Sequence, residues 1–447
     1  MPPTTAKGPN VRRSSLGTVL LVLFLDLVGF SIVFPMFAHI LEWYGAQGGG
    51  LLTDLNAGID SLFGLSGEEV GMRHAAFFGG MLAGLYSIIQ FLVTPFWGRL
   101  SDRIGRKPVL LATVVLNALG YLLWIFSGSF TLFVVSRIIC GFASGNISVA
   151  SAAVADLSTE KDRAKAMGLM GAAIGLGFIA GPALGATFAL MPQPSGDGGA
   201  FALNPFSFPA AIAFALSVFN VIWILRRLEE TRPESGAPSR SVRSINPLRF
   251  FRRDLGEGIA TLNFAYLVFM VGFAGFEGTL VFLLVEKLDY VPGSVGLCMV
   301  WIGFCSAMIQ GGVVRRVVAK TGERKLARLG MLLLIPGYVI CGIVAWNETE
   351  VLMWLGVTLL AFGVGFLSPT LAAMVSVRSS KNTQGEAMGS YRSVGALGRA
   401  LGPILAAVLY FRFGAGAPYL AAAGLAVIPL VMISSRRLDD AAQANPA

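Results

Sequence analysis

The stretch Gly98-Arg-Leu-Ser-Asp-Arg-Ile-Gly-Arg-Lys-Pro108 lies between two long apolar runs of the 447-residue chain. Gly98 allows two helices to approach closely, and Gly105 allows a left-handed turn that other residues rarely adopt. Asp102 can cap the helix that follows and can pair with an arginine of the same stretch. A plain basic loop would not need an acid between two glycines, so the stretch predicts a structured turn between two helices.

The composition places this turn in a membrane protein. Hydrophobic residues make up 55% of the chain and charged residues 13%, against about 25% charged residues in soluble domains. The net charge of +9 is explained by basic loops beside a lipid bilayer rather than by a nucleic-acid surface. The four cysteines lie in apolar runs, and the chain has only two histidines. We therefore expect no metal site and no cofactor.

Twelve apolar segments are long enough to span a bilayer. They predict an all-α membrane protein with twelve transmembrane helices, at residues 16–38, 76–97, 108–127, 130–154, 165–190, 206–225, 259–285, 294–314, 326–346, 351–376, 387–411 and 416–434.

The basic residues predict the orientation of these spans. If the N-terminus is cytoplasmic, 29 of the 34 Lys and Arg residues fall on the cytoplasmic side and 3 on the opposite side. Such an imbalance predicts a multi-pass protein of the inner (cytoplasmic) membrane with both termini in the cytoplasm.

The chain divides around its largest polar segment. Residues 226–258 predict a cytoplasmic linker between an N-terminal six-helix half, 1–225, and a C-terminal six-helix half, 259–447. The basic cluster Arg249, Arg252 and Arg253 in the linker is interpreted as an interfacial anchor.

Two features of the first half recur in the second. Gly105 in the turn after the second span has a counterpart in Gly322 after the eighth, and Gly181-Pro182 has one in Gly402-Pro403. Two repeats at about half the chain length indicate tandem halves, as in transporters built from parallel repeats.

Four stretches together resemble the major facilitator superfamily, in its twelve-helix drug:proton antiporter branch typified by tetracycline efflux pumps. They are Leu25–Pro35 with Asp26, the 98–108 turn, Ser136–Asp156 with Arg137, and the glycine-rich segment after Gly171.

The resemblance implies that the 98–108 turn forms a cytoplasmic gate by latching the two halves together. The expected gate residues are Gly98, Asp102, Arg103, Gly105, Arg106 and Asp156. The second copy has Ala319 in place of Asp102 and Glu323 in place of Arg106, so we expect an asymmetric latch.

The fifth span carries glycines at helical spacing. Gly177, Gly181 and Gly185 share one face, and Gly171 and Gly175 form a second pair. Such grooves let a neighbouring helix approach closely, and a proline at position 182 bends the helix. The resemblance identifies Gly171, Gly175, Gly181, Pro182 and Gly185 with the family's antiporter motif, which is associated with exporters.

Ionisable residues at membrane depth are costly and indicate function. Asp26 and Arg137 lie near the middle of the first and fourth spans, and Glu277 and Arg399 are interpreted as their counterparts in the second half. A carboxyl group removed from water can bind and release a proton near neutral pH. Asp26 and Glu277 are therefore the predicted proton carriers, and Arg137 and Arg399 the predicted cavity charges.

Polar side chains within the spans can line a substrate cavity or join helices by hydrogen bonds. The substrate-cavity candidates are Gln90, Asn117, Asn146, Asn263, Tyr266 and Gln310. The outside loop 39–74 is longer than the resemblance implies. In it Leu52, Leu55, Ile59 and Leu62 predict a short amphipathic helix with Asp54 and Asp60 on its other side.

These features predict a monomeric, proton-coupled exporter of small amphipathic compounds or drugs that works by alternating access. A sugar or metabolite facilitator or symporter on the same fold remains the alternative. An enzyme is disfavoured, because the sequence shows no nucleophile–base pair and no phosphate-binding loop.

Overall fold

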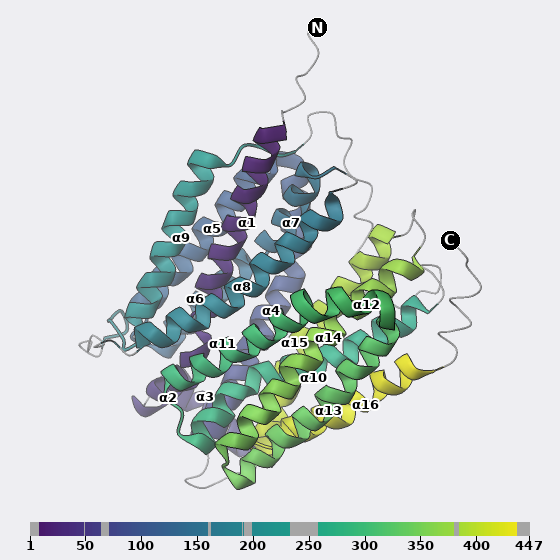
Figure 1. Ribbon diagram of the computed structural model, residues 1–447. Coiled ribbons are helices and arrows are strands. Elements are labelled where there is room, and N and C mark those ends of the chain that lie inside the picture. Colours follow the sequence, from purple (N-terminus) through teal and green to yellow (C-terminus); the bar gives the residue numbers. More distant parts are fainter. Residues whose placement is uncertain are drawn as a thin grey trace. The chain divides into compact units, whose positions relative to one another are not determined.

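The computed structural model describes residues 9–48, 50–63, 71–159, 162–189, 191, 199–232, 258–379 and 384–435. Over these ranges the chain is helical, and twelve of its helical segments are long and apolar enough to cross a membrane. The predicted all-α, twelve-span fold is therefore confirmed (Figure 1).

The helices are α1 (Pro9–Ser31), α2 (Phe37–Ala46), α3 (Leu51–Phe63), α4 (Gly71–Ile104), α5 (Arg106–Ile125), α6 (Phe130–Ala143), α7 (Asn146–Leu157), α8 (Arg163–Ala189), α9 (Ser207–Arg227), α10 (Ile259–Leu288), α11 (Pro292–Met308), α12 (Arg315–Thr321), α13 (Glu323–Asn347), α14 (Glu350–Arg378), α15 (Gln384–Phe413) and α16 (Ala417–Ser434). A 3₁₀ turn, Phe34–Met36, joins α1 to α2, and a π-helical segment, Ile309–Val314, joins α11 to α12.

Contacts divide the chain into two compact units. Unit 1 comprises Met1–Phe34 and Leu92–Arg243, and unit 2 comprises Pro35–Phe91 and Ser244–Ala447. The boundary passes through α4, whose first part packs in unit 2. The compact units therefore differ from the predicted sequence halves in residues 35–91.

Unit 1 is a helical bundle in which α1 and α5 are central. α1 packs against α7, α8 and α9, and α5 packs against α6, α7 and α9. Its core is made of branched aliphatic and small side chains, with Trp97 as the one large aromatic member among the buried residues of the cluster. Close packing of these side chains fixes the helices that carry Asp26 and its partners.

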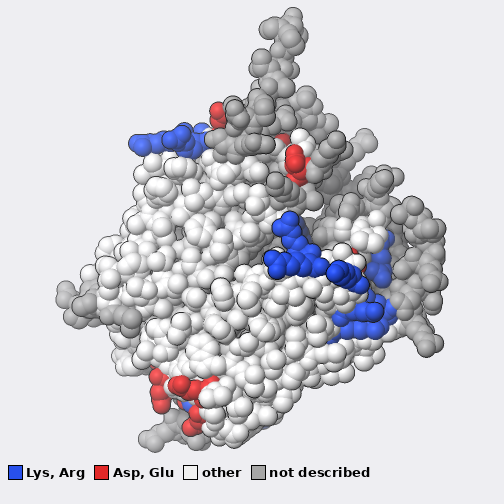
Figure 2. Space-filling model, viewed as in Figure 1, with Lys and Arg blue, Asp and Glu red and all other residues white. Residues whose placement is uncertain are grey.

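Unit 2 is organised around α10 and α13. α10 packs against α15 and α16, while α13 packs against α14 and α16, and α11 lies on α14. Lys and Arg side chains gather over α12, and acidic side chains gather at the end of the unit where α2 and α3 lie (Figure 2). The two ends of unit 2 therefore differ in charge.

The predicted span 130–154 is interrupted. α6 ends at Ala143, α7 begins at Asn146, and the Trp97 ring occupies the space that a side chain at Gly145 would fill. The Trp97 indole N–H donates to the Phe142 carbonyl over 2.7 Å, so one carbonyl at the break has a partner. The break brings Asn146 to the start of α7.

The outside loop 39–74 is mostly helical. α2 continues the first span to Ala46, and α3 confirms the predicted short helix. In this helix Leu55 is 39% exposed, and Asp60 binds the His74 ring over 2.9 Å.

The end of α9 at Arg227 agrees with a linker that begins near residue 226. The basic cluster Arg249, Arg252 and Arg253 lies outside the described residues.

The internal repeat is visible in local geometry. Gly105 precedes α5 with φ 109° and ψ 161°, and Gly322 precedes α13 with φ 79° and ψ 150°. Two residues after each glycine, a basic side chain reaches the end of the last helix of its half: Lys107 Nζ donates to the Leu225 carbonyl over 3.3 Å, and Arg324 Nε to the Ile433 carbonyl over 2.7 Å. The two turns are therefore built alike.

Candidate functional site

Asp26 lies on α1 at the centre of a small polar cluster in unit 1. Asn117 of α5 donates from Nδ2 to Asp26 Oδ1 over 2.7 Å, and Asn146 of α7 donates from Nδ2 to Asp26 Oδ2. Both asparagines are buried, with 4% and 3% exposure. Two predicted cavity residues are thus direct partners of the predicted proton carrier.

The partners of Asp26 are neutral amides, so protonation of the carboxylate would leave no buried cation without a counter-charge. The Asn146 Oδ1 atom is buried and has no hydrogen-bond partner among the described residues. A protonated Asp26 needs an acceptor for its O–H, and an asparagine offers both a donor and an acceptor. The cluster can therefore satisfy both states of the carboxyl group.

Arg137 of α6 is buried, and no ion pair within 4.0 Å joins it to Asp26 in the described structure. Its guanidinium lies 4.6 Å from the centroid of the Trp124 ring and 5.3 Å from that of Phe133. Nε donates to Ser136 Oγ over 3.2 Å, whereas Nη2 is buried without a partner among the described residues. A buried cation stacked on indole thus keeps an unused donor.

Glu277 of α10 and Arg399 of α15 both reach the surface of unit 2. The two charges act on each other electrostatically, but no ion pair within 4.0 Å joins them in the part of the chain that the structure describes. Because both lie within apolar spans, exposure to lipid would be costly for either charge.

The close helix contacts of α1 and α10 give a register in which Glu277 can be compared with Asp26. Gly181 of α8 approaches the Val28 carbonyl of α1, and Gly402 of α15 approaches the Val271 carbonyl of α10. If Val271 corresponds to Val28, the residue equivalent to Asp26 is Phe269. In this register Glu277 lies two turns farther along its helix than the residue that corresponds to Asp26.

The other cavity candidates are separated in the structure. Asn263 is fully buried and donates from Nδ2 to Ser390 Oγ over 2.9 Å, while the Tyr266 ring stacks on Tyr391 with centroids 3.9 Å apart. Both contacts join α10 to α15. Gln310 is exposed in the π-helical segment, and Gln90 is half-buried on α4.

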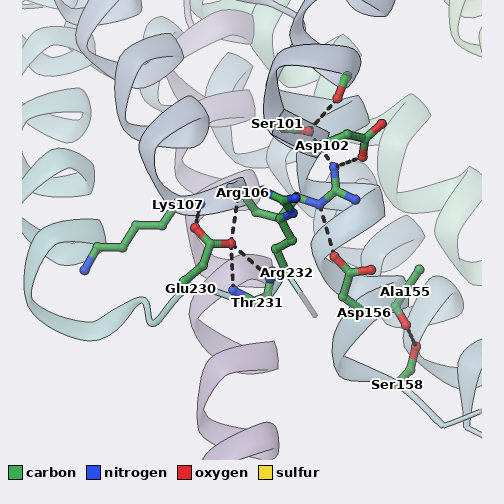
Figure 3. Close-up of polar contacts among 11 residues, drawn as sticks. Ser101, Asp102, Arg106, Lys107, Ala155, Asp156, Ser158, Glu230, Thr231 and Arg232 are labelled. Atoms are coloured by element: carbon green, nitrogen blue, oxygen red, sulfur yellow. Dashed lines mark hydrogen bonds and ion pairs between the residues drawn. The ribbon is translucent and has the colours of Figure 1, made fainter. Parts of the chain in front are cut away.

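The gate candidates form a network around Arg106 in unit 1 (Figure 3). Arg106 Nη1 lies 2.6 Å from Asp102 Oδ1, and its Nε lies 3.0 Å from Asp156 Oδ2. Nη1 also donates to Ser101 Oγ over 2.6 Å. One guanidinium thus ties the end of α4 to the end of α7 through two carboxylates.

Glu230, which follows α9, is a member of this site that the sequence did not single out. Its Oε1 accepts from the Arg106 amide over 2.8 Å and its Oε2 from the Lys107 amide over 3.2 Å. Glu230, rather than the expected Asp102, therefore caps the N-terminus of α5. Burial raises the pKa of the Glu230 carboxyl, but bonds from four backbone N–H groups outweigh burial and bring the pKa below its ordinary value.

Two further gate candidates, Arg103 and Gly98, act through the backbone rather than through a side chain. The Arg103 carbonyl accepts from Arg232 Nη1 over 2.6 Å, which holds the segment after α9 beside the turn. Gly98 has only Ser148 Oγ nearby, 3.8 Å from where a Cβ would lie. The close helix approach expected at Gly98 is found at Gly145 instead.

The predicted antiporter motif divides into two sets. A side chain at Gly181 would meet Ser31 of α1, and one at Gly177 would meet Leu27. Gly171 and Gly175 have nothing within 4 Å among the described residues. Pro182 lies inside α8, and Gly185 is buried. The close helix contact is therefore confined to the later glycines.

Known proteins match this arrangement over most of its length. The model of the family described as Major Facilitator Superfamily matches residues 19–403. The human protein named major facilitator superfamily domain-containing protein 10 is 31% identical, covering 97% of this chain and 94% of its own. The class E tetracycline resistance protein of Escherichia coli is 28% identical, covering 88% and 86%. The crystal structure of the human organic anion transporter MFSD10 matches with a TM-score of 0.73 and 30% identity, covering 94% of this chain and 99% of that chain.

Proposed function

Because the chain belongs to the Major Facilitator Superfamily, whose matched members are transporters rather than enzymes, we propose that it is a proton-coupled exporter. In this proposal protons move inward while a small amphipathic compound moves outward. The main support for this proposal is the Asp26 carboxylate, which binds two neutral amides inside the spans of unit 1. The protein works as a monomer in the inner membrane with both termini in the cytoplasm.

Asp26 is the proton carrier in this proposal. When ionised it accepts from Asn117 and Asn146, and when protonated it donates to the Asn146 Oδ1 atom after the amide turns over. A carboxylate paired with an arginine would resist protonation, because a lone buried cation would remain. The separation of Asp26 from Arg137 supports a role in proton binding.

Arg137 binds the substrate in this proposal. Its unused Nη2 donor and the Trp124 ring on which it stacks suit a ligand with an anionic group and an aromatic body. The 30% identical solved relative is described as an organic anion transporter. We therefore place organic anions among the substrates, and name Glu277 and Arg399 as further charges on the transport route.

The 98–108 turn acts as the gate in this proposal. The Arg106 network and the Glu230 cap hold the ends of α4, α5 and α7 in a single arrangement within unit 1. Transport requires the access path to open on one side at a time, and a rigid turn at the end of these helices can move them as a group.

Proteoliposomes with an imposed pH gradient test the proposal. Aromatic organic anions should move against their gradient with the wild type, and Asp26→Asn should abolish this pH-driven accumulation. The control Asp162→Asn removes an exposed carboxylate of the same unit and should transport normally. Accumulation by Asp26→Asn at the wild-type rate would overturn the assignment of the carrier.

A conservative change separates substrate binding from proton coupling. Arg137→Lys retains the charge but cannot reproduce the planar guanidinium on the Trp124 ring. It should raise the half-saturating anion concentration by about tenfold, the scale of one charge-assisted hydrogen bond, while proton movement remains coupled. An unchanged half-saturating concentration would exclude Arg137 from the substrate site.

A further inference from the structure

A cavity in unit 2 lies beneath the short helix α3, and its lining includes no residue of the Asp26 cluster or of the Arg106 network. It measures about 340 Å³, within the range of small-molecule sites. Its walls come from three elements: α2, α3 and the first turns of α4. No step of the proposed transport function uses it.

The helix α3 is held over this cavity by specific contacts. Leu52 and Ile59, seven residues apart on one face, are only 5% and 9% exposed. The Asp60 carboxylate bonds the His74 ring of α4 over 2.9 Å. These contacts hold α3 in place along its buried face, so the wall that α3 contributes to the cavity is fixed.

Two oxygen acceptors at this cavity have no partner among the described residues. Asn56 lies one turn after Leu52 on the same face of α3, and its Oδ1 atom is buried without a hydrogen bond in the described structure. Glu42 of α2 also lines the cavity, and no described residue forms an ion pair or hydrogen bond with its carboxylate. A buried acceptor without a partner is rare in native proteins, so Asn56 Oδ1 needs an explanation. The Glu42 side chain is exposed, so its carboxylate is accessible to a charged ligand.

Apart from His74, whose ring binds Asp60, the side chains in the rest of the lining are apolar. Leu41, Met72 and Phe78 contribute aliphatic and aromatic surface beside the two acceptors. Acidic side chains gather at this end of unit 2 (Figure 2). A complementary ligand therefore carries hydrogen-bond donors with positive charge at one end and an apolar body at the other.

We infer that the cavity beneath α3 is a binding site for a protonated amine with an apolar body. The Glu42 carboxylate and Asn56 Oδ1 accept from the ammonium group, and the leucines with Phe78 cover the body. The amine can belong to a soluble amphipathic compound or to the headgroup of phosphatidylethanolamine. The inference does not depend on the transport proposal, because binding here needs neither Asp26 nor a gradient.

Equilibrium binding of monodansylcadaverine, a fluorescent primary amine, tests the site in nanodiscs of phosphatidylcholine. The wild type should bind it saturably, and Glu42→Gln and Asn56→Leu should each weaken binding by about tenfold, the scale of one charge-assisted hydrogen bond. Asp54→Asn is the matched control, because Asp54 is an exposed carboxylate on the same helix. Its affinity should equal that of the wild type.

Two further arms make the result decisive. The N-acetylated probe has the same body without the charge, and it should bind at least about tenfold more weakly. Nanodiscs containing phosphatidylethanolamine should lower the apparent affinity if the lipid headgroup occupies the site, and leave it unchanged if soluble amines do. An unfolding midpoint equal to that of the wild type shows that Glu42→Gln is folded. Wild-type affinity in both Glu42→Gln and Asn56→Leu, or equal binding of the acetylated probe, would overturn the inference.

Discussion

Replacing Gly105 by alanine perturbs the turn between α4 and α5 in two ways. Its φ of 109° and ψ of 161° lie in a region almost confined to glycine, where another residue costs about 1–3 kcal/mol. The added methyl group would also overlap Glu230 Oε2. The Glu230 carboxylate would then leave the amides of Arg106 and Lys107, which it binds over 2.8 and 3.2 Å.

The loss of the cap adds to the backbone strain. Hydrogen bonds to a charged group contribute about 1.5–3 kcal/mol each when buried, but Glu230 is only half-buried, and water would replace part of the loss. We assign about 1 kcal/mol to the two bonds together, since exposed charges contribute little. Gly105→Ala should therefore lower the free energy of unfolding by about 2–4 kcal/mol.

The repeat in the chain supplies a matched control. Gly322 has φ 79° and ψ 150°, and nothing lies within 4 Å of where its Cβ would be. Gly322→Ala should therefore cost only the backbone strain. Unfolding by titration with sodium dodecyl sulfate in mixed micelles measures both variants. Equal losses for Gly105→Ala and Gly322→Ala would refute the role of Glu230 as a cap.

Three further predictions concern the described contacts. Gly181→Ala should destabilise the protein by about 1–3 kcal/mol through overpacking against α1. Gly171 has open space around it, so Gly171→Ala should be neutral or stabilising by up to about 1 kcal/mol. Thermal unfolding of the two variants compares their stabilities. Trp97→Phe should lower the unfolding free energy by about 1–3 kcal/mol because the Phe142 carbonyl loses its donor, and chemical denaturation measures it. The pKa of the Glu230 carboxyl is lowered in the folded state. Its contribution to the stability of the fold is therefore present above the ordinary pKa of 4.5 and is lost as the pH falls through the lowered pKa. The difference in unfolding midpoint between the wild type and Glu230→Gln should then vanish in acid.

The fold was predictable because its signals are local. Twelve apolar runs, a charge imbalance between loops and a glycine in each turn are all properties of contiguous residues. The same reasoning found α3 from Leu52 and Ile59. It gave no partner for Asp60, because a helical spacing gives the period of a face but not the tilt of the helix against its neighbours.

The site was harder to predict where long-range contacts decide it. Asp26 stands out as a charge in an apolar span, but its pairing with Asn117 and Asn146 depends on the break in the fourth span. That break follows from the Trp97 ring at Gly145, which no sequence spacing indicates. Glu230 was missed for a related reason: it binds backbone amides, and such partners leave no side-chain pattern.

The two turns of the repeat share a backbone but not a charge network, and the difference has a physical consequence. In the first turn Arg106 is held by the two carboxylates of Asp102 and Asp156. In the second turn Ala319 has no carboxylate and Glu323 replaces the arginine, so Arg324 is left to bind carbonyls at the end of α16. A motion that separates α4 from α7 must therefore break two ion pairs, whose charge-assisted bonds contribute about 1.5–3 kcal/mol each, whereas the Arg324 bonds of the second turn have neutral carbonyl acceptors. A ligand that shifts the equilibrium of the first turn must therefore supply the free energy of these two ion pairs through its own contacts.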